Sequence, residues 1–139
     1  MLRNLSYNNK EIIKEVNEYV GRNFSFIERV KMGGNGSRRM MIDKASDEIS
    51  TLLGYDNNMN FCNVELRPKG IILRFRSLLE TFGLVISYQD LSMSRSFQSV
   101  TIFCGEEYVV LKSAPGQHLD TKFIDRICEM QSMVLTRTA

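Results

Sequence analysis

The stretch FCNVELRPKGIILRFR, residues 61–76, decides the fold class of this chain of 139 residues. Apolar and polar residues alternate on each side of its centre, as in strands with one buried face. The apolar positions are Cys62, Val64 and Leu66, then Ile71, Leu73 and Phe75. The central Arg67-Pro68-Lys69-Gly70 predicts a turn, because proline presets the first central φ and Gly70 can adopt the left-handed conformation. The stretch therefore predicts a β-hairpin.

The same alternation continues toward the C-terminus. It predicts four further strands, at residues 83–88, 91–95, 100–104 and 108–112. Links of only two to four residues join these four strands to one another. Links this short join antiparallel neighbours. We therefore expect an antiparallel meander of about six strands, strongly bent or barrel-like.

A helix is predicted after the meander. Asp120 is a suitable N-cap, and apolar residues then recur every three or four positions. The stripe consists of Phe123, Ile124, Ile127, Met130 and Val134. Because a sheet must bury one of its faces, we expect this helix to cover the meander. The predicted fold class is α+β.

The segment before residue 61 is predicted to be mainly helical. Asn8 or Asn9 caps a helix over about residues 9–21, and Gly21 ends it. Its apolar face consists of Ile12, Ile13, Val16, Tyr19 and Val20.

A second helix is predicted with Asp43 as its cap and Gly54 as its end. Its apolar face consists of Ile49, Leu52 and Leu53. Residues 24–30 suggest a short strand, and the glycine-rich segment 32–39 (MGGNGSRR) a flexible loop. Residues 56–60 are predicted to form another loop. Residues 1–60 and 61–137 are expected to be parts of a single domain, 1–139.

Composition restricts the classes of function. The chain is 43% hydrophobic and 24% charged, which is close to the average of globular domains. Its net charge is +2, and neither half is strongly basic, so nucleic acid is not an expected partner. The first ten residues lack the apolar core of a signal peptide, and no apolar run is long enough to span a bilayer. Three isolated cysteines indicate a reducing compartment. We therefore expect a cytoplasmic protein.

No catalytic, metal or cofactor site is predicted. Cys62, Cys104 and Cys128 are far apart in the sequence, and His118 is the single histidine. Zinc ligands normally include closely spaced pairs. Asp120, beside His118, is explained as a helix cap, and the glycine-rich segment lacks the GK[ST] ending of a P-loop. We expect no cofactor and no catalytic residue.

The segment LVISYQDLSM, residues 84–93, joins two apolar strands through an acidic turn. With the order of elements over residues 61–137, it resembles the pleckstrin-homology-like superfold, including bacterial and GRAM-type members. This resemblance implies a bent sheet with a helix at one end, and a seventh strand for which residues 24–30 are the candidate. Secretion-chaperone-like and NTF2-like folds are alternatives.

The resemblance also implies a binding site. Phosphoinositide-binding members of this superfold carry a K-x(n)-[KR]-x-R pattern across their first hairpin. Lys69, Arg74 and Arg76 match this pattern, with Arg67 beside them. Alternatively, Arg74 and Arg76 are the solvated side of an amphipathic strand.

The leading functional hypothesis is a non-enzymatic module that binds a protein or acts as a scaffold. A helix of about 13 residues is unstable alone, so the N-terminal helix must dock on its own domain or on a second copy. The second case is a homodimer. One alternative is a module that binds an anionic ligand or a membrane surface through the basic hairpin. Another is an enzyme with a pocket that the sequence does not reveal.

Overall fold

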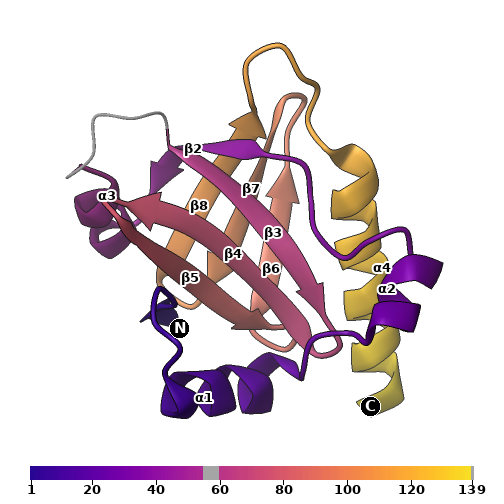
Figure 1. Cartoon of the computed structure of the whole chain (residues 1–139). Helices are drawn as coiled ribbons and strands as arrows, with labels where there is room; N and C mark the ends of the chain where they lie inside the picture. The colour runs from indigo at the N-terminus through magenta and orange to yellow at the C-terminus, as the bar shows by residue number, and fades with distance from the viewer. Residues whose placement is uncertain (55–59, 139) are drawn as a thin grey trace.

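The computed structural model describes residues 1–54 and 60–138, and its framework is an eight-stranded antiparallel sheet (Figure 1). The strands are β1 (Leu2–Asn4), β2 (Met40–Ala45), β3 (Phe61–Arg67), β4 (Gly70–Ser77), β5 (Glu80–Ser87), β6 (Leu91–Arg95), β7 (Ser99–Cys104) and β8 (Glu107–Ser113). The helices are α1 (Lys10–Val20), α2 (Phe26–Lys31), α3 (Asp47–Gly54) and α4 (Thr121–Thr138). The α+β class and the antiparallel meander are confirmed.

The sheet bends but does not close into a barrel. Its strand order is β1-β5-β4-β3-β2-β8-β7-β6, so β1 and β6 are edges. Strand β2 lies between two groups of strands, β1-β5-β4-β3 and β8-β7-β6, and joins them because it pairs with both β3 and β8. Its register shifts between Ile42 and Lys44, and such irregularities bend a strand. Figure 1 shows β3, β4 and β5 in front of β6, β7 and β8, with α4 along one side.

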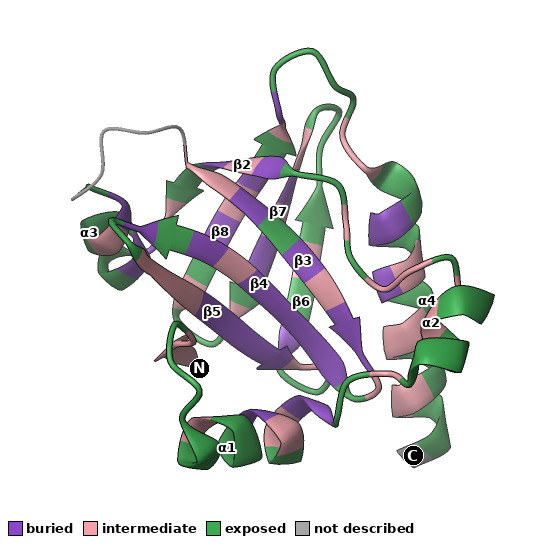
Figure 2. Ribbon diagram, viewed as in Figure 1, coloured by how far each residue is buried: buried purple, intermediate pink, exposed green. Residues whose placement is uncertain are grey.

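The main core lies between the inner face of the sheet and α4. The apolar positions of the predicted hairpin all face this core, and the six are at most 4% exposed. From α4, Phe123, Ile124 and Ile127 enter the same core at 2% exposure or less, while Met130 and Val134 pack at its margin. Asp120 caps the first turn through the Phe123 amide. Figure 2 shows the buried positions along β3, β4 and β5.

Helix α1 covers part of the outer face of the sheet. Asn9 caps the helix and Gly21 ends it, as the sequence indicates. Val16 and Val20 pack against Ile72 of β4 and Val85 of β5 in a second, smaller apolar cluster. The helix therefore docks on its own chain, and the homodimer stays a prediction without support from this helix.

Residues 24–30 do not form the expected strand, and 26–31 are helix α2. Ser25 and Glu28 form a capping box, in which each side chain bonds to the other residue's backbone N–H. This local pairing starts a helical turn and outweighs the alternation of Phe24 and Phe26. The predicted strand was wrong because the spacing of Ser25 and Glu28 is itself a helix signal.

Residues 40–45 form β2, so Asp43 does not cap a helix. Helix α3 begins later, at Asp47, and the backbone N–H of Ser50 donates to Ser46 O at 2.8 Å. The glycine-rich segment 32–39 lacks regular structure as expected, but it is held along β3. Ser37 N donates to Val64 O at 2.8 Å. The predicted loop at 56–60 lies outside the described residues except for Asn60.

Gly70 does not adopt the left-handed conformation expected from the turn. It is absent from the glycines that have positive φ. A Cβ at Gly70 would lie 2.1 Å from Ile86 O and 2.7 Å from Val20 Cγ1. Glycine is needed there because β5 and α1 approach the backbone closely.

None of the helices in the described ranges combines the length and the apolar character needed to cross a membrane.

Candidate anion-binding site on the outer face of the sheet

The four predicted anion-binding residues do not form one site. They come from β3, the β3–β4 turn and β4. Arg67, Arg74 and Arg76 project from the outer face of the sheet, which α1 covers only in part. The structure gives each of the four a different environment.

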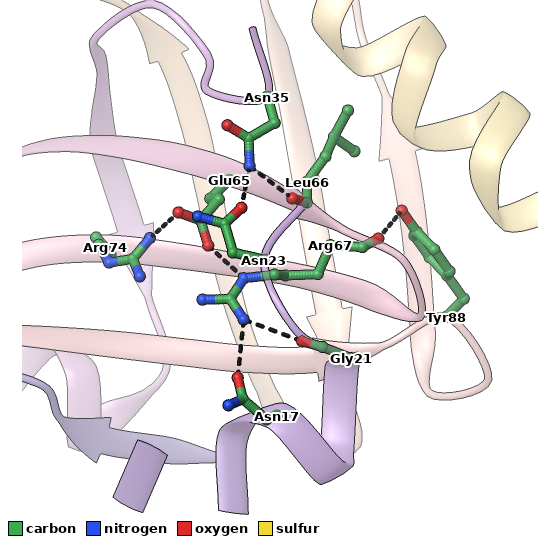
Figure 3. Close-up of polar contacts among 9 residues, drawn as sticks. All are labelled: Asn17, Gly21, Asn23, Asn35, Glu65, Leu66, Arg67, Arg74 and Tyr88. Carbon is green, nitrogen blue, oxygen red and sulfur yellow. Dashed lines mark hydrogen bonds and ion pairs between the residues drawn. The ribbon is translucent and has the colours of Figure 1, made fainter. Parts of the chain in front are cut away.

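Arg67 is an internal structural residue. It is only 8% exposed, and Figure 3 shows its guanidinium between β3 and the end of α1. Its Nε donates to Glu65 at 2.5 Å, and Nη1 donates to Asn17 at 3.1 Å and to the Gly21 carbonyl at 2.9 Å. These contacts join the sheet to α1 and occupy the guanidinium. Arg67 is therefore not available to a ligand.

Lys69 lies far from the other candidates. It is exposed in the β3–β4 turn, and its backbone N–H donates to Val20 O at 2.8 Å. Arg76 lies at the opposite end of β4, seven residues or about 24 Å away at the rise of a β-strand. One small anion cannot contact both side chains.

Arg74 and Arg76 line a surface depression together with a third arginine, which the sequence did not indicate. Arg39, just before β2, lines the same depression because β2 pairs with β3. We call this depression the basic recess. Its volume is about 280 Å³, and it is lined by Arg39, Phe61, Cys62, Asn63, Arg74, Phe75, Arg76 and Thr81.

The three arginines of the basic recess differ in what already binds them. Arg74 Nη1 lies 3.1 Å from Glu65 Oε1, and its side chain is 31% exposed. The Arg39 guanidinium lies 4.6 Å from the centre of the Phe61 ring, a cation–π contact that leaves its N–H donors free. Among the described residues, no carboxylate or hydrogen-bond acceptor pairs with Arg39 or Arg76.

The recess has the chemistry of an anion site. Guanidinium groups present several N–H donors in a plane and bind phosphate or carboxylate oxygens by charge-assisted hydrogen bonds. The Asn63 amide and the Thr81 hydroxyl add two neutral donors to the lining. Glu65 pairs with only one of the three arginines and is shared with Arg67, so the site keeps a positive charge.

The described residues bring no set of metal ligands together. No group of three or more His, Cys, Asp or Glu side chains comes together in residues 1–54 and 60–138. His118 is exposed, and Asp120 is engaged as the cap of α4. Burial raises the pKa of the Cys62 thiol to about 12, which keeps it protonated at neutral pH.

The basic recess could be predicted only in part from the sequence. Arg74 and Arg76 are two residues apart on one strand, so their shared face was evident. Arg39 is 35 residues before Arg74, and only the pairing of β2 with β3 brings it there. No local pattern marks it.

Comparison of the chain with protein-family models, with curated proteins and with solved structures found no match.

Proposed function

We propose that this chain is a binding module that holds a phosphate group in the basic recess. The observation that carries the proposal is the convergence of Arg39, Arg74 and Arg76, two of which have no acceptor among the described residues. Arginines without an acceptor in the described part of the chain, gathered in one depression, are poised to bind an anion. The phosphate can belong to a soluble ligand or to a lipid head group.

A leucine tip beside the recess favours a lipid as the source. Leu78 and Leu79 form the β4–β5 turn and are 58% and 87% exposed. Arg76 and Thr81, which line the recess, pair with each other one residue from this turn. Apolar side chains next to basic ones are typical of proteins that lie on anionic membranes.

The backbone of the leucine tip adds support. Leu78 has φ 56°, the one positive φ outside glycine among the described residues. The left-handed conformation costs a leucine about 1 kcal/mol relative to glycine. The two-residue turn accounts for the positive φ, but not for an exposed leucine in place of glycine or asparagine, and a contact of that side chain outside the chain would account for the choice.

The pleckstrin-homology resemblance belongs to the same proposal. Strands β2 to β8 are seven in number and are followed by α4. The resemblance implies seven strands and a C-terminal helix; in this proposal β2 to β8 and α4 take those places, the extra strand is at 40–45 rather than 24–30, and β1 is an additional edge strand. One fold can host many functions. The proposed function therefore rests on the residues of the basic recess and not on the resemblance.

Vesicle flotation at low salt tests the proposal. The vesicles contain phosphatidylcholine with 30% phosphatidylserine, or phosphatidylcholine alone. We expect the chain to float with the anionic vesicles only, and Arg39→Ala/Arg76→Ala to lower the bound fraction at least fivefold. Lys69→Ala/Lys122→Ala removes two exposed positive charges outside the recess and is the matched control. Equal loss in the control and the double variant would mean that binding follows net charge alone.

A second arm separates lipid from soluble phosphate. Inorganic pyrophosphate is titrated into the chain and its affinity is measured by calorimetry. Binding of pyrophosphate without flotation, lost in the double variant, assigns the recess to a soluble ligand. If neither probe binds, or if both bind the double variant as they bind the unmodified chain, the proposed function is wrong.

A further inference from the structure

Helix α2 exposes an apolar ridge, which consists of Phe26, Ile27 and Val30. These side chains are 74%, 65% and 63% exposed, and no residue of the helix is buried. Val30 follows Phe26 by four positions and Ile27 by three, so the three side chains share one helical face. Large apolar side chains grouped in this way mark a surface that another molecule covers.

The chain fixes the ridge on both sides. Phe24 before the helix and Met32 after it pack against the main core. Farther on, the Asn35 side chain donates to Leu66 O at 3.1 Å, and Leu66 N donates back to Asn35 O at 2.7 Å. A helix this short is unstable without outside contacts. Contacts on both sides therefore hold this segment in place, and the ridge is exposed even so.

The ridge lies in a strongly basic segment. Residues 22–39 contain Glu28 as their one acidic residue. Their basic residues are Arg22, Arg29, Lys31, Arg38 and Arg39. Arg22 and Lys31, before and after the ridge, are both exposed. Because interfaces are complementary in charge, the surface that covers the ridge must be acidic.

A second copy of the chain does not meet this requirement. A two-fold contact through α2 would bring the same patch of each copy together. Arg22 and Lys31 of one copy would then face the same basic residues of the other. Like charges brought together across an interface cost free energy, so self-association through the ridge is disfavoured.

A membrane bound at the leucine tip does not reach the ridge either. Asn35 holds the segment after α2 beside Leu66, which pairs with Ile71 near the start of β4. Leu78 follows Ile71 by seven residues, about 24 Å along the strand. The ridge and the leucine tip therefore lie at opposite ends of β4.

We infer that the ridge docks on a partner protein, against an amphipathic helix whose apolar stripe is flanked by Asp and Glu. The ridge side chains fit between the residues of such a stripe as helices pack, and the carboxylates face Arg22 and Lys31. The inference goes beyond the proposed function. Only the step that excludes a membrane as the surface covering the ridge rests on the proposed function.

Two designed, fluorescently labelled helical peptides test this inference by anisotropy at low salt. Both carry a leucine stripe, flanked by glutamates in one and by lysines in the other. We expect the full chain to bind the acidic peptide and not the basic one. Phe26→Ser/Val30→Ser is expected to weaken binding at least tenfold. Phe97→Ser is the matched control and is expected to change nothing, because Phe97 is 96% exposed in the β6–β7 turn.

A charge reversal tests the flanks without changing the ridge. Arg22→Glu/Lys31→Glu is expected to lose the acidic peptide and to bind the basic one. Failure of the unmodified chain to prefer the acidic peptide, or unchanged binding by the ridge variant, would overturn the inference. So would flotation or a dimer that the ridge variant abolishes, since these would assign the ridge to a membrane or to a second copy. Arg76→Ala, which changes the recess but leaves residues 22–39 intact, is expected to bind the acidic peptide normally, and this separates the test from that of the recess.

Discussion

Arg67 and Glu65 form an ion pair at 2.5 Å on the outer face of the sheet, where the two side chains are only 10% and 18% exposed. The same carboxylate binds Arg74 through its other oxygen at 3.1 Å. Glu65 thus binds two arginines of the hairpin, of which Arg67 is locked in the structure and Arg74 remains at the edge of the basic recess.

Arg67→Ala is expected to lower the free energy of unfolding by about 3 kcal/mol. The change removes the donor that binds the Asn17 side chain and the Gly21 carbonyl. It also removes one of the two cations that pair with the partly buried Glu65 carboxylate. Urea denaturation measures this change. Lys69→Ala, an exposed cation two residues away, is expected to stay within about 0.5 kcal/mol of the unmodified chain. Equal losses in the two variants would contradict the structural role of Arg67.

Gly70→Ala is expected to destabilise the chain by about 2–4 kcal/mol, because the new Cβ would overlap the Ile86 carbonyl oxygen and displace Val20 of α1. Thermal unfolding followed by circular dichroism measures the loss. Gly36→Ala is the control, because a Cβ there meets no atom within 4 Å and the residue has no positive φ. A stable Gly70→Ala variant would mean that α1 and β5 do not approach the hairpin as described.

Leu78→Gly separates stability from binding at the leucine tip. Glycine adopts the positive φ of Leu78 without strain, so the free energy of unfolding is expected to stay level or rise by up to about 1 kcal/mol. The same change removes one of the two exposed leucines, and the fraction bound to anionic vesicles is expected to fall at least threefold. A variant that is less stable but binds as before would show that Leu78 serves the fold rather than a membrane.

The strands after residue 61 were predictable because an apolar residue that faces the main core recurs at every second position along each of them, even though Ile72 and Val85 on the outer face are also apolar and buried under α1. Strand β2 was not, because its Met40-Met41-Ile42 start does not alternate in polarity and its register shifts before Lys44. The β4–β5 turn was also missed. Leu78 and Leu79 occupy positions where glycine or asparagine is the usual signal.

Two of the three arginines of the basic recess were predictable. The spacing of Arg74 and Arg76 placed both on one face, and this is confirmed. Arg67 shares that face, but the docking of α1 buries it, and strand periodicity carries no information about a helix packed on top. Lys69 is near Arg74 in sequence but lies at the far end of β4.

Stability is expected to depend on pH through Cys62. Burial raises the pKa of its thiol from 9.0 to about 12. Between these values the unfolded chain loses the proton and the folded chain keeps it. The free energy of unfolding therefore falls as the pH rises above about 9, by at most about 1.4 kcal/mol per pH unit from this group, and is unaffected below that range.

Urea denaturation at pH 8 and pH 10 under reducing conditions measures this dependence. Cys62→Ala is expected to show a smaller loss of stability between the two pH values, whatever its absolute stability. Cys128→Ala is the control, because Cys128 is exposed. A pH dependence that Cys62→Ala leaves unchanged would contradict the burial of this thiol.

The most direct test of the basic recess is a pyrophosphate titration followed by the backbone amide and arginine Nε–H signals of the isotope-labelled chain in nuclear magnetic resonance. We expect saturable shifts concentrated at Arg39, Phe61, Arg74, Arg76 and Thr81, with Lys69 and Arg67 unchanged. Shifts centred on Lys69, or no saturable shift at any arginine of the recess, would contradict it.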